Sequence, residues 1–231
     1  LGGWLLKPQL LILIIPFILF QRLGKILWGF LTSSAIIFLI SFGLTQGKGF
    51  LNLINLFLEA GSGAVTSNPA AMINWRMLGW YIASITSPPI GWTFIIISSI
   101  ITLSASLYIL ARQKISDSNR FIIAILGIFA ATCAITWHSH LHMAMVLIPP
   151  LIYLKTKGEI NNKLFFAWVF APIATKFIGY IFATMFQAQN LRMLSFQAQT
   201  LSTGLTGLIL NLLILGWAIK QYPHSKEQAL K

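Results

Sequence analysis

The sequence has few charged residues for its length. Only 9% of its 231 residues are Asp, Glu, Lys or Arg, whereas 57% are hydrophobic. A soluble domain usually carries about a quarter charged residues, which it needs to cover its surface. The composition therefore excludes an ordinary soluble protein. It predicts an all-α membrane protein, because several apolar runs are long enough to cross a bilayer as helices.

Acidic residues are scarcer still. The chain has 4 acidic and 16 basic residues, and its formal net charge is +12. In a soluble protein this charge would suggest a nucleic-acid partner. In a membrane protein, basic residues flank the spans and set their orientation, so no nucleic acid is expected.

Several chemical motifs are also missing. Cys133 is the only cysteine, so an internal disulfide is excluded, and its apolar surroundings favour a core residue. No Walker loop, dinucleotide fingerprint or serine nucleophile elbow occurs, and we expect no cofactor. The sequence begins Leu-Gly-Gly-Trp, without an initiator Met or a signal peptide. This start predicts the C-terminal fragment of a longer protein.

Seven apolar runs predict a polytopic helical bundle forming a single transmembrane domain over residues 1–231. The expected spans are residues 4–20, 26–44, 91–111, 121–137, 140–154, 164–186 and 201–219. The fifth is short and contains Pro149 and Pro150, so we expect it to tilt or break.

The basic residues predict the orientation of these spans. Lys and Arg are concentrated in cytoplasmic connections, and one set of connections holds most of them. This set comprises Arg22, Lys25, Arg112, Lys114, Arg120, Lys155, Lys157, Lys163, Lys220, Lys226 and Lys231. Residues 220–231 then form a cytoplasmic tail, and residues 45–90 form an extracytoplasmic loop. We expect a multi-pass protein of the plasma membrane with its active face outside the cytoplasm.

The outer loop, residues 45–90, has two parts. In residues 50–58, Asn52 and Asn55 lie three apart on one helical face, which predicts an amphipathic helix at the membrane interface. Glycines and a proline then exclude a continuous helix. The apolar stretch after Arg76 ends at a proline pair and is expected to be re-entrant or to lie on the surface.

Three histidines stand close together in the stretch TWHSHLHMAMVLIPP, residues 136–150. On an extended backbone His138, His140 and His142 share one face, whereas on a helix only His138 and His142 do. Anion binding, proton transfer and metal ligation are possible functions, and an interfacial packing role is the alternative. No carboxylate or cysteine stands nearby to complete a ligand set, so we expect no metal.

Three basic residues outside the cytoplasmic set complete the candidate site. Arg76 has a planar fork suited to phosphate, although it could merely snorkel to the interface. Lys7, at the outer end of the first span, could bind phosphate or anchor the helix. Lys176 lies inside the sixth span and should face protein or a water-filled cavity. Only Glu59 among the acids is expected outside, which excludes catalysis by an outer pair of carboxylates.

The order of three short motifs resembles a known family. They are KPQ at residues 7–9, NPAAMINWRMLGW at residues 68–80 and HSHLHMAMVLIPPL at residues 138–151. This order is similar to the C-terminal part of the bacterial α-1,2-mannosyltransferase-like family, integral-membrane glycosyltransferases of the GT-C class that use polyprenyl-phosphate sugars. The sequence departs from the family pattern at Ala71, Met77 and Met143, where the family often has Gly, Gly and an acidic residue.

The resemblance implies an enzyme that moves a hexose, mannose in the family, from a polyprenyl-phosphate donor to a lipid or glycan acceptor. Its partners would be the donor, the acceptor and membrane lipids. The presumed catalytic Asp of the family belongs to a first outer loop that this chain does not contain. The residues implied to bind the donor phosphate or sugar are Lys7, Asn74, Arg76, His138, His140 and His142.

A transporter or channel is the alternative from another class. The three histidines and Lys176 would then line a proton or ion path. The sequence shows neither an internal repeat nor paired broken helices, which argues against this interpretation. A structural membrane subunit without chemistry would leave the histidines and the long outer loop unexplained.

Overall fold

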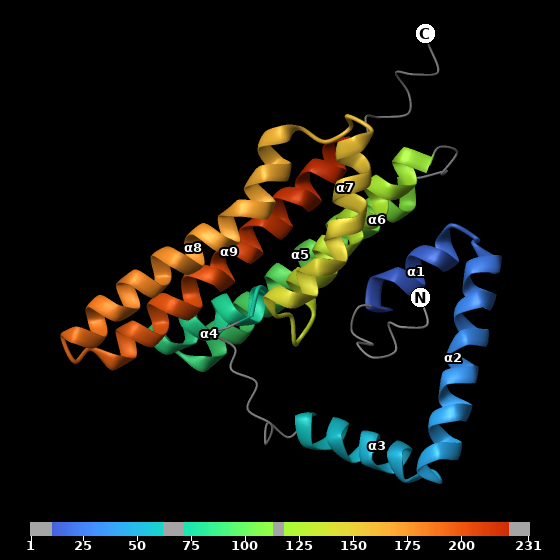
Figure 1. Ribbon diagram of the computed structural model, residues 1–231, viewed down its shortest axis with the longest axis horizontal. Coiled ribbons are helices and arrows are strands. Elements are labelled where there is room, and N and C mark those ends of the chain that lie inside the picture. Colours follow the sequence, from blue (N-terminus) through green and yellow to red (C-terminus); the bar gives the residue numbers. More distant parts are fainter. Residues whose placement is uncertain (1–10, 62–71, 113–117, 222–231) are drawn as a thin grey trace. The chain divides into compact units, whose positions relative to one another are not determined.

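The protein is helical throughout the parts described by its computed structural model, residues 11–61, 72–112 and 118–221 (Figure 1). No strand occurs in these ranges, and two residues form an isolated β-bridge. The prediction of an all-α protein is confirmed. The chain divides into two units, residues 1–68 and residues 69–231, which are described separately.

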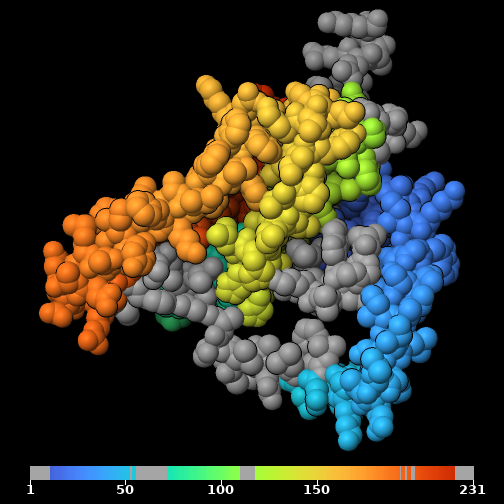
Figure 2. All heavy atoms as spheres, in the orientation of Figure 1, coloured from blue at the N-terminus to red at the C-terminus, as the bar shows by residue number. Residues whose placement is uncertain are grey.

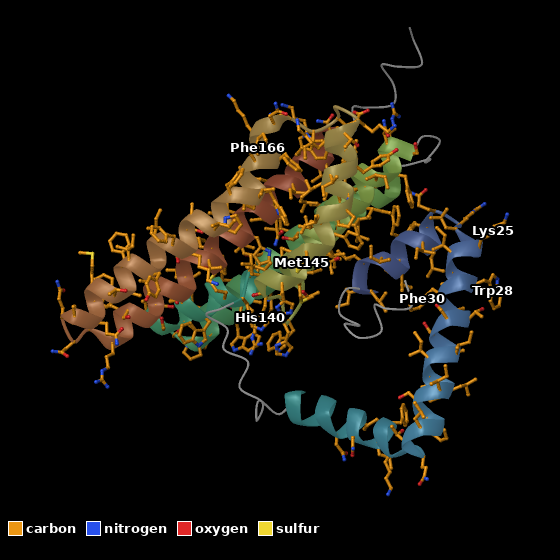
Figure 3. The ribbon with its side chains drawn as sticks, in the orientation of Figure 1. Lys25, Trp28, Phe30, His140, Met145 and Phe166 are labelled. Carbon is orange, nitrogen blue, oxygen red and sulfur yellow. The ribbon has the colours of Figure 1, made fainter. Side chains whose placement is uncertain are left out.

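The first unit contains α1 (Leu11–Phe20), α2 (Gly24–Thr45) and α3 (Lys48–Gly61), each packed on the next. Gly47 has φ 80° between α2 and α3, and its N–H donates to Phe42 O at 3.0 Å. Glycine suits this left-handed position, which ends the helix and turns the chain. In α2, Lys25 and Trp28 point away from Phe30, which is the buried residue of this helix (Figure 3).

Helix α3 covers the residues predicted to form an interfacial helix. Asn52 and Asn55 are exposed on it, but so are Phe50, Leu51 and Ile54. A helix is therefore present where the pattern predicts one. Its location at the membrane interface stays a prediction. Of the residues expected to exclude a continuous helix, Gly61 is the last residue of α3, and Gly63 and Pro69 lie outside the described residues.

The second unit is built around α6 (Ser118–Ile135). Nearly every residue of α6 from Ile123 to Ala134 is buried, and the helix packs mainly against four other elements. These elements are α5 (Pro88–Arg112), the 3-10 helix η4 (Leu141–Leu147), α7 (Ile148–Thr156) and α9 (Arg192–Lys220). The histidine stretch leaves the end of this central helix directly, so its backbone starts from a well-packed position.

Helix α8 (Asn162–Ala188) lies alongside α9 at the periphery of the second unit (Figure 1). Figure 2 shows its side chains, coloured orange, on the outer surface. Only 6% of its most apolar 18-residue stretch is buried, compared with 61% of the corresponding stretch in α6. In a membrane, the exposed apolar face of α8 is suited to contact with lipid.

Within the described ranges, five helices are long and apolar enough to cross a membrane, which indicates a membrane-associated protein. They are residues 24–45, 88–109, 118–135, 162–188 and 201–220. The predicted first and fifth spans correspond to shorter apolar helices. The described part of the first is the 10-residue helix α1, and the fifth corresponds to the 16-residue helical stretch 141–156. A total of seven spans stays a prediction.

The predicted fifth span changes its helix type instead of breaking at its prolines. Residues 141–147 form the 3-10 helix η4, and the chain becomes α-helical at Ile148. Pro149 and Pro150 occupy the first turn of α7, where a proline is tolerated because the N–H groups have no intrahelical acceptor.

The apolar stretch after Arg76 forms α4 (Trp75–Ile85), which folds back along α5. Two glycines allow this close approach. A Cβ added at Gly79 would lie 2.9 Å from the Gly91 carbonyl oxygen and would overlap the Ile95 side chain. The indole N–H of Trp75 donates to Thr102 Oγ1 at 2.8 Å and closes the other end of the contact.

Gly79→Ala tests this contact. We expect it to destabilise the protein by about 2 kcal/mol, because the added methyl group forces α4 away from α5. Gly216→Ala in α9 is the matched control, since nothing lies within 4 Å of a Cβ there. It should stabilise by about 0.5–1 kcal/mol through helix propensity. Unfolding by a denaturing detergent, followed by circular dichroism, measures both changes. Equal effects of the two substitutions would contradict the close packing.

Candidate anion-binding site

The side chain of Asn74 connects two segments that are distant in sequence. Its Oδ1 accepts a hydrogen bond from Met77 N at 3.1 Å and caps α4. Its Nδ2 donates to Thr136 O at 2.6 Å and to Trp137 O at 3.4 Å. The residue is only 1% exposed. Sequence analysis placed Asn74 among the ligand-binding residues, but its polar atoms bind the protein itself and hold the start of α4 against the histidine stretch.

The backbones of the same two segments also pair. Ile73 N donates to Ser139 O at 2.7 Å, and Met72 forms an antiparallel bridge with His140. Met72 and Ile73 are fully buried. His140 has an extended backbone, with φ −97° and ψ 165°, and Met72 is its bridge partner. Figure 3 shows His140 where this stretch approaches α4.

Arg76 lies in the first turn of α4 and rests on an aromatic stack. Its guanidinium carbon lies 4.0 Å from the centre of the Trp137 ring, and Nη1 lies 3.4 Å from Trp137 O. Trp137 stacks in turn on Trp92, with ring centres 5.4 Å apart and planes at 17°. Burial lowers the pKa of Arg76. The guanidinium still keeps its charge, because its ordinary pKa is far above neutral.

The three histidines gather beside this stack. The His140 and His142 rings are stacked, with centres 5.8 Å apart and planes at 17°. The pKa of His138 is lowered below 6.5 by burial, and then by the positive charges of Arg76 and His140. The stacked pair is therefore His140 and His142, whereas a helical backbone would have placed His138 and His142 on one face. The chain leaves the extended conformation only at Leu141, where η4 begins.

A cleft of about 370 Å³ opens between α4 and α5 next to Arg76. Arg76 is the basic residue of its lining, and Trp80, Trp92 and Ile95 provide apolar surface. The cleft thus combines one cation with an apolar wall, which suits an anion that carries a hydrocarbon group.

No carboxylate neutralises this site among the residues whose side chains are described. Within them Glu159 is the one acidic residue, and its Oε1 accepts a hydrogen bond from Asn119 Nδ2 at 2.9 Å. Asn119 begins α6, and the histidine stretch follows the end of this 18-residue helix, about 27 Å away. Among the described side chains, no acid would therefore compete with an anionic ligand for Arg76.

The two other predicted basic residues are Lys7 and Lys176. Lys7 lies outside the described residues. Lys176 lines a separate groove on α8 together with Leu141. In the ranges that the structure describes, no group of three or more His, Cys, Asp or Glu side chains is placed to hold a metal ion.

Sequence analysis missed the aromatic part of the site. Trp137 directly precedes the histidines, and Trp92 stands near the start of a predicted span. Tryptophan is common at membrane interfaces, so neither position was distinctive by itself. Their stacking depends on the packing of α4 and α5 beside the end of α6.

Comparisons with known proteins found no family model, no curated protein and no solved structure that matches this chain.

Asn74→Asp tests the bond that holds the site together. The carboxylate keeps the acceptor for Met77 N but loses the donor to Thr136 O, and we expect a loss of at least about 2 kcal/mol in stability. Asn161 caps α8 through Leu164 N at 3.0 Å and is exposed, so it provides a matched control. Asn161→Asp should be neutral or stabilise by about 0.3–1 kcal/mol. Thermal unfolding in detergent measures both, and equal losses would refute the bridging role.

The charge of Arg76 can be measured through His138. Arg76→Gln should raise the pKa of His138, but not fully to 6.5, because burial remains the larger cause of its depression. An NMR titration of ring-labelled histidine in micelles measures this change. Arg192→Gln, at the start of α9, is the control and should leave the pKa unchanged. If Arg76→Gln also leaves it unchanged, the two groups do not interact.

The same depressed pKa has a consequence for stability. The folded protein favours neutral His138, whereas the unfolded chain binds a proton near pH 6.5. The contribution of this group to stability is therefore complete above pH 6.5 and is lost as the pH falls through the lower, folded-state pKa.

Proposed function

We propose that this chain binds the phosphate of a polyprenyl-phosphate sugar and belongs to an integral-membrane glycosyltransferase. The enzyme would move a hexose, mannose by the family resemblance, to a lipid or glycan acceptor on the extracytoplasmic side. One observation carries the proposal. Arg76 and the three histidines come from segments distant in sequence, yet they gather at one place where no described carboxylate neutralises them.

The chemistry of sugar transfer calls for such a site. When the acceptor hydroxyl attacks the sugar, the bond between the anomeric carbon and the phosphate oxygen breaks, and the leaving phosphate gains a negative charge. Fixed positive groups that meet this charge lower the barrier. The planar fork of Arg76 can bind two phosphate oxygens, and the histidines can donate further hydrogen bonds. The base that takes the acceptor proton is not assigned to a residue of this chain.

The depressed pKa of His138 suits this role. In the free site its ring is held neutral by burial and by the nearby positive charges. A bound phosphate would offset those charges and favour the protonated ring. His138 would then take up a proton as the donor binds and would supply positive charge when the leaving group needs it.

The lipid part of the donor also has a place. The cleft beside Arg76 is lined by Trp80, Trp92 and Ile95. Apolar burial there is favourable for the isoprene units nearest the phosphate. With the phosphate at Arg76, the chain would lie in this open cleft along α4 and α5.

A proton or ion path through the histidines and Lys176 is the competing function. Neither the cleft beside Arg76 nor the groove on α8 contains all the groups that such a path requires. Arg76 lines the cleft between α4 and α5, Lys176 lines the groove on α8, and the histidine side chains line neither. This separation argues against one continuous path through the histidines and Lys176.

The complete protein provides the test of function. Membranes that contain it are incubated with radiolabelled polyprenyl-phosphate mannose and a lipid-extract acceptor. Arg76→Ala and His140→Ala should each reduce product formation by about 100-fold, because each removes a donor to the leaving phosphate. Arg192→Ala removes another exposed arginine and should retain activity.

Unchanged turnover in both site variants would reject the phosphate site. If the folded protein gives no product with mannose or with other polyprenyl-phosphate sugars, the transferase proposal fails. A proton-flux assay on the histidine variants would then test the competing function.

A further inference from the structure

The two tryptophans of α4 differ in what their indole N–H groups bind. Trp75 donates to Thr102 Oγ1 in α5 at 2.8 Å. Trp80 lines the cleft beside Arg76, and its ring packs edge-to-face on Tyr81 with centres 5.0 Å apart. Among the residues that the structure describes, none accepts a hydrogen bond from the Trp80 N–H. A partly buried indole usually has a hydrogen-bond partner, so this N–H is available to a ligand of the cleft.

Trp80 stands next to Arg76 on the surface of α4. Residues four apart on a helix share a face, with about 5–6 Å between their Cβ atoms. Both side chains line the same cleft of about 370 Å³, whose described lining contains no acid. The cleft therefore holds two neighbouring donors, the charged guanidinium of Arg76 and the neutral indole N–H of Trp80.

The depth of this pair in a membrane suits a headgroup. Trp137, on which Arg76 rests, stacks on Trp92. Trp92 is four residues after Pro88, the first residue of α5, or about 6 Å along the helix axis. The stack therefore lies near one end of this span-length helix and not at its centre. Tryptophan is enriched at that depth, where the hydrocarbon core meets the headgroups.

The surface of α5 continues from the cleft as an apolar ridge. Residues three or four apart on a helix share a face, and those that follow Trp92 at this spacing are Ile96, Ile100 and Leu103. They are 54%, 56% and 36% exposed and lead from the end of α5 toward its middle. Hydrocarbon on this ridge would lie in the bilayer core, with its headgroup back at the cleft.

We propose that Trp80 is a second donor to the lipid phosphate bound at Arg76, and that the hydrocarbon of this lipid leaves the cleft past Trp92 along the exposed ridge of α5. The assignment rests on the phosphate site proposed above and adds a residue that orients the headgroup. Arg76 supplies charge and a planar fork, whereas Trp80 supplies one directed N–H. The two side chains bind different oxygens of the same phosphate.

The first test measures the dissociation constant of farnesyl phosphate for the full chain in detergent micelles, by calorimetry. Trp80→Phe keeps an aromatic ring but removes the N–H, and it should raise this constant about fivefold. Arg76→Gln should raise it at least about tenfold, because a charge-assisted bond is lost. Trp217→Phe is the matched control. Trp217 is also partly buried, near the C-terminal end of α9, and its replacement should leave the constant unchanged.

The indole resonance provides a second readout, which a purely structural role of Trp80 would not move. In the native chain carrying isotope-labelled tryptophan, farnesyl phosphate should shift the Trp80 N–H signal downfield in an NMR spectrum, because the proton now points at an anion. Farnesol has the same hydrocarbon without the charge and should shift the signal less. In Arg76→Gln the shift should be lost at the same ligand concentration.

The outcomes separate this assignment from the phosphate site itself. Unchanged affinity in Trp80→Phe, together with weaker binding in Arg76→Gln, would overturn the assignment and leave the Arg76 site standing. Unchanged affinity in both variants would remove the phosphate site and the role of Trp80 with it. Weaker binding in Trp92→Phe but not in Trp80→Phe would give the donor role to the other tryptophan of the cleft.

Two further results would contradict the proposed ligand. Equal indole shifts with farnesol and farnesyl phosphate would mean that Trp80 only packs against hydrocarbon. Equal affinity for inorganic phosphate and farnesyl phosphate would mean that the cleft takes the free ion and that the ridge of α5 contributes nothing.

Discussion

The hydrogen bond from Asn74 Nδ2 to Thr136 O is the interaction on which the candidate site depends. A buried amide is costly unless its polar atoms are paired, and Asn74 pairs them with two different segments. It caps α4 with one atom and holds the end of α6 with the other. This bond and the bridge between Met72 and His140 fix Arg76 and the histidines relative to one another.

The way Arg76 is held explains why its charge remains available. A carboxylate partner would stabilise a half-buried guanidinium but would also neutralise it. Trp137 instead lies against its face, and Trp92 stacks on Trp137. A cation and an aromatic face attract each other without cancelling the charge. The positive potential therefore persists, and it is strong enough to lower the pKa of His138.

Composition and periodicity predicted the helical class, most long helices and the residue types of the site, because these depend on local sequence. The pairing of His140 with His142 could not be predicted in this way. It depends on the start of a 3-10 helix at Leu141 and on a bridge to Met72, which is distant in sequence. The close approach of Gly79 to Gly91 is likewise a tertiary property. The family resemblance implied Asn74 as a ligand, whereas its burial and its hydrogen bond to Thr136 O are tertiary properties that a sequence does not contain.

Arg76 and Lys176 occupy different surroundings, and each residue type suits its place. Arg76 is half-buried against a ring, where a planar, weakly hydrated guanidinium stacks well. Lys176 is exposed on an apolar helix, where its flexible hydrocarbon stem can lie along the apolar surface. Arg76→Lys would impair the first position, since lysine cannot stack as a plane on Trp137. Leu141 stands between His140 and His142 in the sequence and lines the groove that contains Lys176.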